Sequence, residues 1–201
     1  MKKGCLVVGI GAVAVVIFFV VILAIWGVSK YNAFVSLEEG VKSQWANVEN
    51  VYQRRADLIP NLVNTVKGYA THEEKTLTEV IEARAKATQT TIDPTKLTEE
   101  NIAAFQKAQD GLSGALSRLM VSVEQYPNLK ANENFLDLQS QLEGTENRIA
   151  VERRTFNEKA QAFNTAIRRF PANIVAGFGG FQPKGYFQAA EGSDKAPTVQ
   201  F

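Results

Sequence analysis

The chain has 201 residues, and its 22 lysine and arginine residues nearly balance its 21 aspartate and glutamate residues, giving a formal net charge of +1. Removing Lys2 and Lys3, which precede an apolar segment, leaves 20 basic against 21 acidic residues and a net charge of −1. A nucleic-acid-binding surface needs a clear excess of basic side chains, so no nucleic-acid partner is expected. The single cysteine, Cys5, excludes an intrachain disulfide, so a hydrophobic core must hold any folded domain.

Residues Cys5 to Val28 form an uninterrupted apolar segment. It is longer than the about 20 apolar residues that a helix needs to span a hydrocarbon core of about 30 Å. A cleaved secretory signal would be shorter and would end in small residues, whereas this segment ends in Ala24-Ile25-Trp26. Only Met1–Gly4 precede Cys5, so no apolar segment upstream presents it for lipidation. We therefore predict an uncleaved transmembrane signal anchor over residues 1–29, in contact with membrane lipid.

The basic residues beside this segment predict its orientation. Lys2, Lys3 and the terminal amine lie before it, whereas Lys30, followed by Glu38 and Glu39, lies after it. The positive-inside rule places the more basic side in the cytoplasm, so we expect a cytoplasmic N-terminus and an exported C-terminal domain. Because the basic excess is small and acidic residues count for little in this rule, a cytoplasmic C-terminal domain remains the alternative.

After the anchor, apolar residues follow the sevenfold spacing that is typical of a long helix in a coiled coil or bundle. Two complementary series carry the spacing: Phe34, Val41, Val48, Leu62 and Tyr69, and Leu37, Trp45, Tyr52, Ile59 and Val66. Arg55 interrupts the first series. Pro60 removes the helical hydrogen bond to the Ala56 carbonyl, so we expect the helix to kink there.

A second sevenfold series predicts a long last helix that ends at Phe170-Pro171. Its members are Phe135, Leu142, Ile149, Phe156, Phe163 and Phe170. Two shorter helices are predicted between the long ones, the first opened by Thr71 in a capping box with Glu74 and the second by Thr98. Because short turns join these elements, we predict an all-α fold with an antiparallel up-and-down four-helix bundle over residues 30–176, in which the first and last helices are long.

The tail, residues 177–201, is rich in glycine, proline and polar residues, as flexible linkers are. It also holds more aromatic rings than a passive spacer needs, and we expect these rings to dock on the bundle or on a neighbouring subunit: Phe178, Phe181, Tyr186 and Phe187. Even so, we expect deletion of Gly185–Phe201 to leave the stability of the bundle nearly unchanged.

The end of the tail places Val199 and Phe201 in an alternating apolar pattern beside the free carboxylate. Three interpretations remain open. The segment adds as a strand to a PDZ-type groove of a partner, it pairs with the tail of a neighbouring subunit, or it is a frayed terminus.

Several motifs resemble those of the LemA family of bacterial membrane proteins. They are Trp45-x-x-Val48-Glu49, Gln53-Arg-Arg-Ala-Asp-Leu-Ile-Pro-Asn-Leu-Val63, Tyr69-Ala-x-His-Glu73, Leu116-Ser-Arg-Leu119, Glu124-x-Tyr-Pro-x-Leu-Lys-Ala131, Glu146-Asn-Arg-Ile-Ala150 and Tyr186-Phe187. The resemblance covers nearly the whole chain. It implies a bacterial source and a four-helix bundle behind a single N-terminal span, and it brings no agreed enzymatic activity, substrate or cofactor.

The sequence offers little for catalysis or metal binding. His72 is the only histidine, and Glu73 and Glu74 beside it do not complete a metal site. Cys5 lies within the anchor, where no base activates its thiol. The paired carboxylates Glu99-Glu100 are explained by the dipole at a helix start. We therefore expect no enzymatic activity, no metal and no cofactor.

Arg55 occupies a core position of the first helix, where an unpaired guanidinium would be very costly. The first and last helices of an up-and-down bundle are adjacent, so Glu146 or Glu152 is the expected partner. Such a pair would fix the register of the bundle. The alternatives are that Arg55 reaches water along its own aliphatic stem, or that this polar bundle layer binds a ligand.

These features favour a non-enzymatic scaffold in the bacterial inner membrane that self-associates into a homo-oligomer through the bundle flanks and the aromatic tail. The alternative is a sensor or adaptor whose bundle binds a ligand or a partner protein of the envelope. An envelope hydrolase is the third hypothesis. Large assemblies favour the scaffold, whereas a monomer with a saturable ligand favours the sensor.

Overall fold

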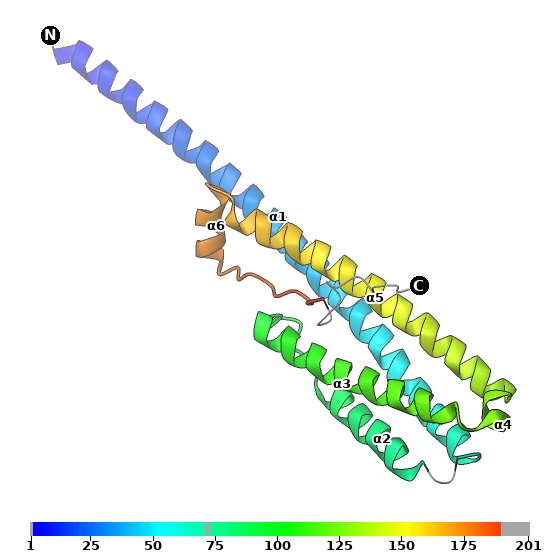
Figure 1. Cartoon of the computed structure of the whole chain (residues 1–201). Helices are drawn as coiled ribbons and strands as arrows, with labels where there is room; N and C mark the ends of the chain where they lie inside the picture. The colour runs from blue at the N-terminus through cyan, green and yellow to red at the C-terminus, as the bar shows by residue number, and fades with distance from the viewer. Residues whose placement is uncertain (1, 71–72, 190–201) are drawn as a thin grey trace, which may run out of the picture. The chain divides into compact units, whose positions relative to one another are not determined.

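The computed structural model describes residues 2–70 and 73–189, and for residues 2–10 and 12 it describes the backbone alone. The helices in these ranges (Figure 1) are α1 (Lys2–Lys67), α2 (Glu74–Gln89), α3 (Glu99–Val123), α4 (Pro127–Lys130), α5 (Glu133–Arg168) and α6 (Ala172–Gly179). No strand occurs within the described ranges, and the prediction of an all-α chain is confirmed.

The chain forms two compact units, and α1 and α5 each contribute to both. The first unit contains the N-terminal part of the chain through Gly40, together with Gln161–Pro183. The second unit contains Val41–Ala160 and, among the described residues of the tail, residues 184–189. Segments far apart in sequence therefore meet in each unit.

In the first unit, the N-terminal part of α1 is apolar and exposed. Between Val13 and Val28 its large apolar side chains are 44% to 66% exposed, except that of Trp26, which is half-buried. Among the described residues, α1 is the one helix that is long and apolar enough to cross a membrane. The predicted long N-terminal apolar helix is thus confirmed, and its exposed surface indicates membrane anchoring.

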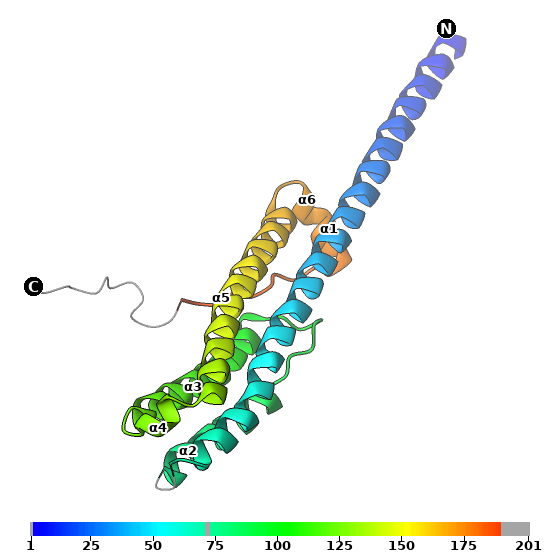
Figure 2. The same ribbon diagram turned by 90° about the vertical axis from the view of Figure 1, so that its right-hand side faces the viewer.

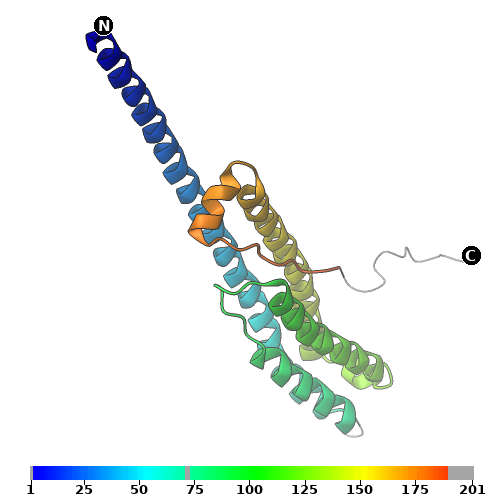
Figure 3. The ribbon, with the colours of Figure 1, turned by 90° about the vertical axis from the view of Figure 1, so that its left-hand side faces the viewer.

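An aromatic cluster closes the first unit just after this apolar segment. The ring centroid of Phe181 lies 5.4 Å from that of Tyr31, 5.5 Å from that of Phe34 and 6.2 Å from that of Phe163. Phe181 reaches this position because Gly180 ends α6 in the left-handed conformation, with a φ of 72° that other residues rarely adopt. As a result, α6 lies beside α1, where the orange helix meets the blue one in Figures 1 and 3.

α6 occupies the start of the segment that the sequence indicated as a linker. The glycine-rich composition predicted a flexible chain from residue 177, but the helix continues to Gly179. Ala172 and Ala176 on its inner side are buried. Packing of that side outweighs the low helix propensity of its glycines.

In the second unit, α1, α2, α3 and α5 share one hydrophobic core. It includes Ile59 and Leu62 from α1, Leu77 and Val80 from α2, Leu112 and Leu119 from α3, and Phe135 and Leu142 from α5. α2 packs antiparallel to α3, and α5 runs antiparallel to α1 (Figure 2). This core holds the elements that carry the polar layer described below.

Pro60 lies inside α1, and the helix continues beyond it to Lys67. Because proline has no N–H, the Ala56 carbonyl loses its helical partner. Arg84 of α2 supplies a replacement, since its Nε donates to the Ala56 carbonyl oxygen at 2.7 Å. Ala56 is only 3% exposed, so this bond satisfies a carbonyl that would otherwise be buried without a partner.

Thr98 caps α3 as predicted, because its hydroxyl oxygen accepts a hydrogen bond from the Asn101 N–H at 3.3 Å. The other predicted cap, Thr71, lies outside the described residues. The helix that it was expected to open, α2, begins at Glu74.

Candidate functional site

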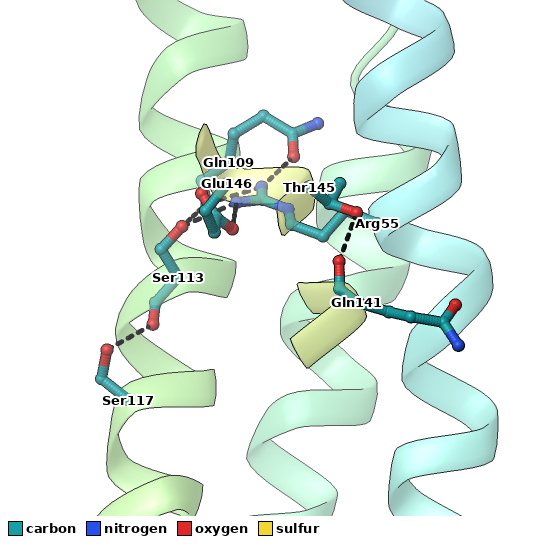
Figure 4. A network of polar contacts seen from close by, with 7 residues as sticks. All are labelled: Arg55, Gln109, Ser113, Ser117, Gln141, Thr145 and Glu146. Atoms are coloured by element: carbon teal, nitrogen blue, oxygen red, sulfur yellow. Dashed lines mark hydrogen bonds and ion pairs between the residues drawn. The ribbon is translucent and has the colours of Figure 1, made fainter. Parts of the chain in front are cut away.

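The polar bundle layer forms around Arg55, which is 1% exposed (Figure 4). Its Nη1 donates to Glu146 Oε1 at 2.6 Å and to Ser113 Oγ at 2.8 Å. Its Nη2 donates to the side-chain oxygen of Gln109 at 2.6 Å and to the Gln109 carbonyl at 3.2 Å. The guanidinium carbon lies 5.1 Å from the centre of the Tyr52 ring, and Nε has no hydrogen-bond partner among the described residues. The buried charge is thus balanced by one carboxylate and several neutral acceptors.

This layer links α1, α2, α3 and α5 in the second unit. Arg55 of α1 contacts Glu146 of α5 together with Gln109 and Ser113 of α3, and Gln109 Nε2 donates to the Ala87 carbonyl of α2 at 3.3 Å. Glu146 is 44% exposed, so the ion pair is buried at the arginine and hydrated at the carboxylate. Directional bonds from Arg55 to α3 and α5, and from Gln109 to α2, disfavour any shift of register along α1.

The two carboxylates proposed as partners of Arg55 have different roles. The structure brings Arg55 and Glu146 together, whereas Glu152 accepts a hydrogen bond from Gln44 Nε2 at 2.6 Å. The alternative in which Arg55 extends to water is wrong, because its side chain is buried.

The sequence analysis missed Gln109. This residue lies between Phe105 and Leu112 at the spacing of the apolar stripe of α3, and it is 5% exposed. A polar side chain within an apolar stripe was the signal that could have identified it, as it did for Arg55.

The aromatic residues of the tail occupy different places. Phe181 packs in the first unit as described, whereas Phe187 packs in the second and is 5% exposed. Tyr186 is half-buried, and Phe178 is 92% exposed. Val199 and Phe201 lie outside the described residues.

Phe187 fills an aromatic socket formed by Trp45, Phe105 and Phe156. Its ring is stacked on Trp45 with an interplanar angle of 14°, and it meets the Phe156 ring edge to face at a centroid distance of 5.5 Å. The guanidinium carbon of Arg153 lies 4.9 Å from the centre of the Phe187 ring. Such cation–π and aromatic contacts stabilise the docked ring beyond the effect of burial.

Two side-chain amides hold the backbone of the same segment. The Phe187 N–H donates to Asn157 Oδ1 at 2.9 Å, and Asn157 Nδ2 donates to the Phe187 carbonyl at 2.8 Å. Gln106 makes the same pair of bonds with the N–H and carbonyl of Gln188, at 3.0 and 3.1 Å. Arg153 Nη2 also donates to the Gln188 carbonyl, at 2.8 Å. The expectation that this segment adds nothing to stability therefore conflicts with its packing.

A model of the LemA family matches residues 44–201. The chain belongs to the LemA family. Magnetosome protein MamQ of Magnetospirillum gryphiswaldense is 30% identical to it, over 82% of this chain and 67% of its own length. Magnetosome protein MamQ 2 of Paramagnetospirillum magneticum is 29% identical over the same shares. Protein LemA of Metamycoplasma hominis is 25% identical, over 88% of this chain and 78% of its own length.

The part of this LemA-family chain that matches the family model includes Arg55, Glu146 and the docked segment. It also includes a cavity of about 100 Å³ beside Arg55, lined among others by Glu49, Tyr52, Thr88, Phe105 and Gln109. Burial raises the pKa of the Tyr52 hydroxyl, and the positive charges of Arg153 and Arg55 oppose that rise. The cavity is thus lined by both polar and aromatic side chains.

Burial also raises the pKa of the Glu49 carboxyl. The neighbouring indole N–H of Trp45 favours the carboxylate and offsets part of the rise, although its geometry does not amount to a hydrogen bond. In the described part of this LemA-family chain, no three His, Cys, Asp or Glu side chains gather in a way that could hold a metal ion. His72 lies outside that part.

Proposed function

We propose that this LemA-family chain is a non-enzymatic, membrane-anchored helical scaffold that self-associates into a homo-oligomer at the bacterial cell envelope. In this proposal residues 1–29 form the anchor in the inner membrane, and residues 30–176 form an up-and-down four-helix bundle. The tail from residue 177 supplies contacts between subunits. The exposed apolar surface of α1 supports the anchor, and the bonds of Arg55 to α3 and α5 support a rigid bundle.

The observation that carries self-association is the way in which Phe187 and Gln188 are bound. Asn157 and Gln106 each pair with a backbone N–H and carbonyl, and the aromatic socket takes one ring. This is how a protein recognises a separate extended peptide. The same segment of a second copy would satisfy every one of these contacts, and exchange of an identical element is a low-cost route to oligomers.

A complementation experiment tests the exchange. The Phe187→Ala chain has an intact site and a defective tail, whereas a Gln106→Ala, Asn157→Ala chain has a defective site and an intact tail. We expect each variant alone to form smaller assemblies than the natural chain, as measured by light scattering in detergent. Mixing the two should restore hetero-assembly, because the intact tail fits the intact site.

The control for this experiment is Val121→Ala on α3, which removes an apolar side chain that is 71% exposed and distant in sequence from the site. It should assemble as the natural chain does. If both defective variants also assemble normally, exchange of the tail is not the basis of assembly. If all chains stay monomeric at every concentration, the scaffold proposal itself is wrong.

We further propose that the N-terminus is cytoplasmic and the bundle exported, on the basis of Lys2 and Lys3 before the span. A Cys5→Ser, Ser193→Cys chain tests this with a membrane-impermeant maleimide. Labelling is expected in spheroplasts. Labelling in inverted inner-membrane vesicles, but not in spheroplasts, would place the bundle in the cytoplasm.

The cavity beside Arg55 favours one alternative, a sensor or adaptor that binds a small ligand. Its volume of about 100 Å³ and its lining by Glu49 and Tyr52 suit a compact polar molecule. Under this alternative the natural chain is a monomer, and a ligand screen by thermal melting finds a saturable shift that Tyr52→Phe removes.

A further inference from the structure

The outer side of α6 carries a row of exposed apolar side chains. Phe170, just before the helix, is 82% exposed, Ile174 is 52% exposed and Phe178 is 92% exposed. Ile174 and Phe178, four residues apart, lie on the side of α6 opposite the buried Ala172 and Ala176, and Phe170 precedes the N-cap residue of this helix. Single exposed apolar residues are ordinary, but three large ones within nine residues mark a surface that contacts something apolar.

This row lies beside the end of the apolar segment of α1, within the same compact unit. The ring of Phe181, directly after α6, contacts Tyr31, which follows the last exposed apolar residue of the segment, Val28, by three positions. A Cβ atom on Gly179 would lie 3.1 Å from the Tyr31 ring. Figures 1 and 3 show α6 alongside α1 in two views. α6 is therefore next to the point where a spanning α1 leaves the hydrocarbon core.

The residues around the row fit the chemistry of a membrane surface. Arg168 and Arg169 precede Phe170 and are exposed, and Lys30 lies on the neighbouring part of α1. Helices that lie in the headgroup region combine an apolar face rich in Phe and Leu with nearby basic side chains. Tyr31 and Trp26 flank the end of the span, where aromatic residues concentrate in membrane proteins.

We propose that Phe170, Ile174 and Phe178 insert into the interfacial layer of the bilayer, so that α6 is a second membrane contact of the chain. The occupant of this surface is lipid, because α6 lies beside the end of the exposed apolar part of α1 and because the basic residues near the row would attract anionic headgroups. The inference rests on the proposed membrane anchor. It adds that the first unit is held against the membrane by two elements instead of one.

Site-directed spin labelling of the full chain tests this. Cys5→Ser removes the one native cysteine, and Phe178→Cys then carries a nitroxide in nanodiscs that hold one chain each. We expect dissolved oxygen to relax the label more strongly than a water-soluble nickel chelate does. The matched control is Val121→Cys on α3, an exposed apolar position where nickel should dominate.

A label at residue 178 that responds to nickel as strongly as the label at residue 121 overturns the proposal. A label at Phe18 on α1 separates this failure from failure of the anchor. If residue 18 is shielded from nickel and residue 178 is not, the anchor stands and the lipid contact of α6 is wrong. If residue 178 is shielded only in discs that hold two chains, and dipolar broadening appears, a second copy covers the row and the lipid proposal is also wrong.

Discussion

At the scale of single residues, burial of Arg55 is tolerable because its partner is not buried to the same extent. Glu146 is 44% exposed and keeps part of its hydration, while Gln109 and Ser113 accept the hydrogen bonds that a lone carboxylate would leave unmade. A pair with both ions buried would lose hydration twice, a loss that often exceeds the attraction between the charges. The arrangement therefore gains directional bonds while only one of the two ions loses its hydration.

Arg55→Ala should lower the free energy of unfolding by about 3–5 kcal/mol, because it opens a void in the core and leaves the buried Gln109 oxygen without its donor. Urea unfolding followed by circular dichroism in detergent measures this loss. Arg55→Met keeps the length of the side chain without its charge and should cost less, since it leaves no void. A midpoint that does not move in Arg55→Ala would mean that the layer contributes nothing to stability.

Glu49→Gln should stabilise the protein at neutral pH. Burial raises the pKa of the folded-state carboxyl above that of the unfolded chain. The natural chain therefore has its full stability from this group below the unfolded-state pKa, and loses that part as the pH rises through the folded-state pKa. The difference between the variant and the natural chain should be largest near pH 7 and vanish toward pH 3. Unfolding curves measured across this pH range test the prediction. A Glu49→Gln chain that is less stable than the natural chain at pH 7 would contradict it.

At the scale of the helices, α1 depends on α2 at the turn that contains Pro60. The proline frees the Ala56 carbonyl, and Arg84 fills the vacancy from the neighbouring helix at 2.7 Å. A local defect in one helix is thus converted into a directional contact between two. A buried carbonyl accepting from a charged donor is among the stronger hydrogen bonds in proteins.

A double-mutant cycle checks this coupling. Arg84→Ala should cost about 1–3 kcal/mol in the natural background, because the Ala56 carbonyl becomes unsatisfied. In a Pro60→Ala background the same substitution should cost much less, since residue 60 regains an N–H that can donate to Ala56. Equal costs in the two backgrounds would show that Arg84 acts elsewhere.

The sequence predicted the helices well because many residues at regular spacing indicate each helix. It predicted single contacts poorly because each contact depends on only one or two residues. Sevenfold apolar spacing marked α1 and α5 many times over, and one arginine within a stripe was enough to indicate a carboxylate from α5. The choice between Glu146 and Glu152 needed the actual register, since both lie on the same helix. The contact of Phe181 with Tyr31 depends on the left-handed conformation of one residue, Gly180. The sequence analysis took this glycine as part of a flexible linker.

At the scale of the whole molecule, the C-terminal part of the chain completes both compact units. Phe181 packs against Tyr31 and Phe34 in the first, and Phe187 packs against Trp45 and Phe156 in the second. The rings that these two residues contact belong to α1, α3 and α5, which are synthesised before the tail. Each unit is therefore complete only when the segment with Phe181 and Phe187 has been made.

Deleting Gly185–Phe201 should lower the free energy of unfolding by about 3 kcal/mol or more, because it empties the aromatic socket. It should also reduce the size of assemblies in nanodiscs. Deleting only residues 191–201 retains Phe187 and Gln188 and is the matched control for both measurements. Unchanged urea midpoints for the longer deletion would show that the docked ring adds nothing to the core, and unchanged assemblies would exclude the tail from self-association.

Binding of the docked segment depends on the identity of very few of its residues. A side chain at residue 185 would begin 2.6 Å from the Glu99 Cα atom, so only glycine fits there. Two positions later, at Phe187, the socket accepts an aromatic ring. Asn157 and Gln106 form hydrogen bonds only with backbone groups, so they do not distinguish one side chain from another. A reporter fused after Ala189 should still allow the segment to dock, whereas Gly185→Ala should prevent docking. Short synthetic peptides built on glycine and phenylalanine at this spacing are thus the natural starting point for a reagent that occupies the site from outside.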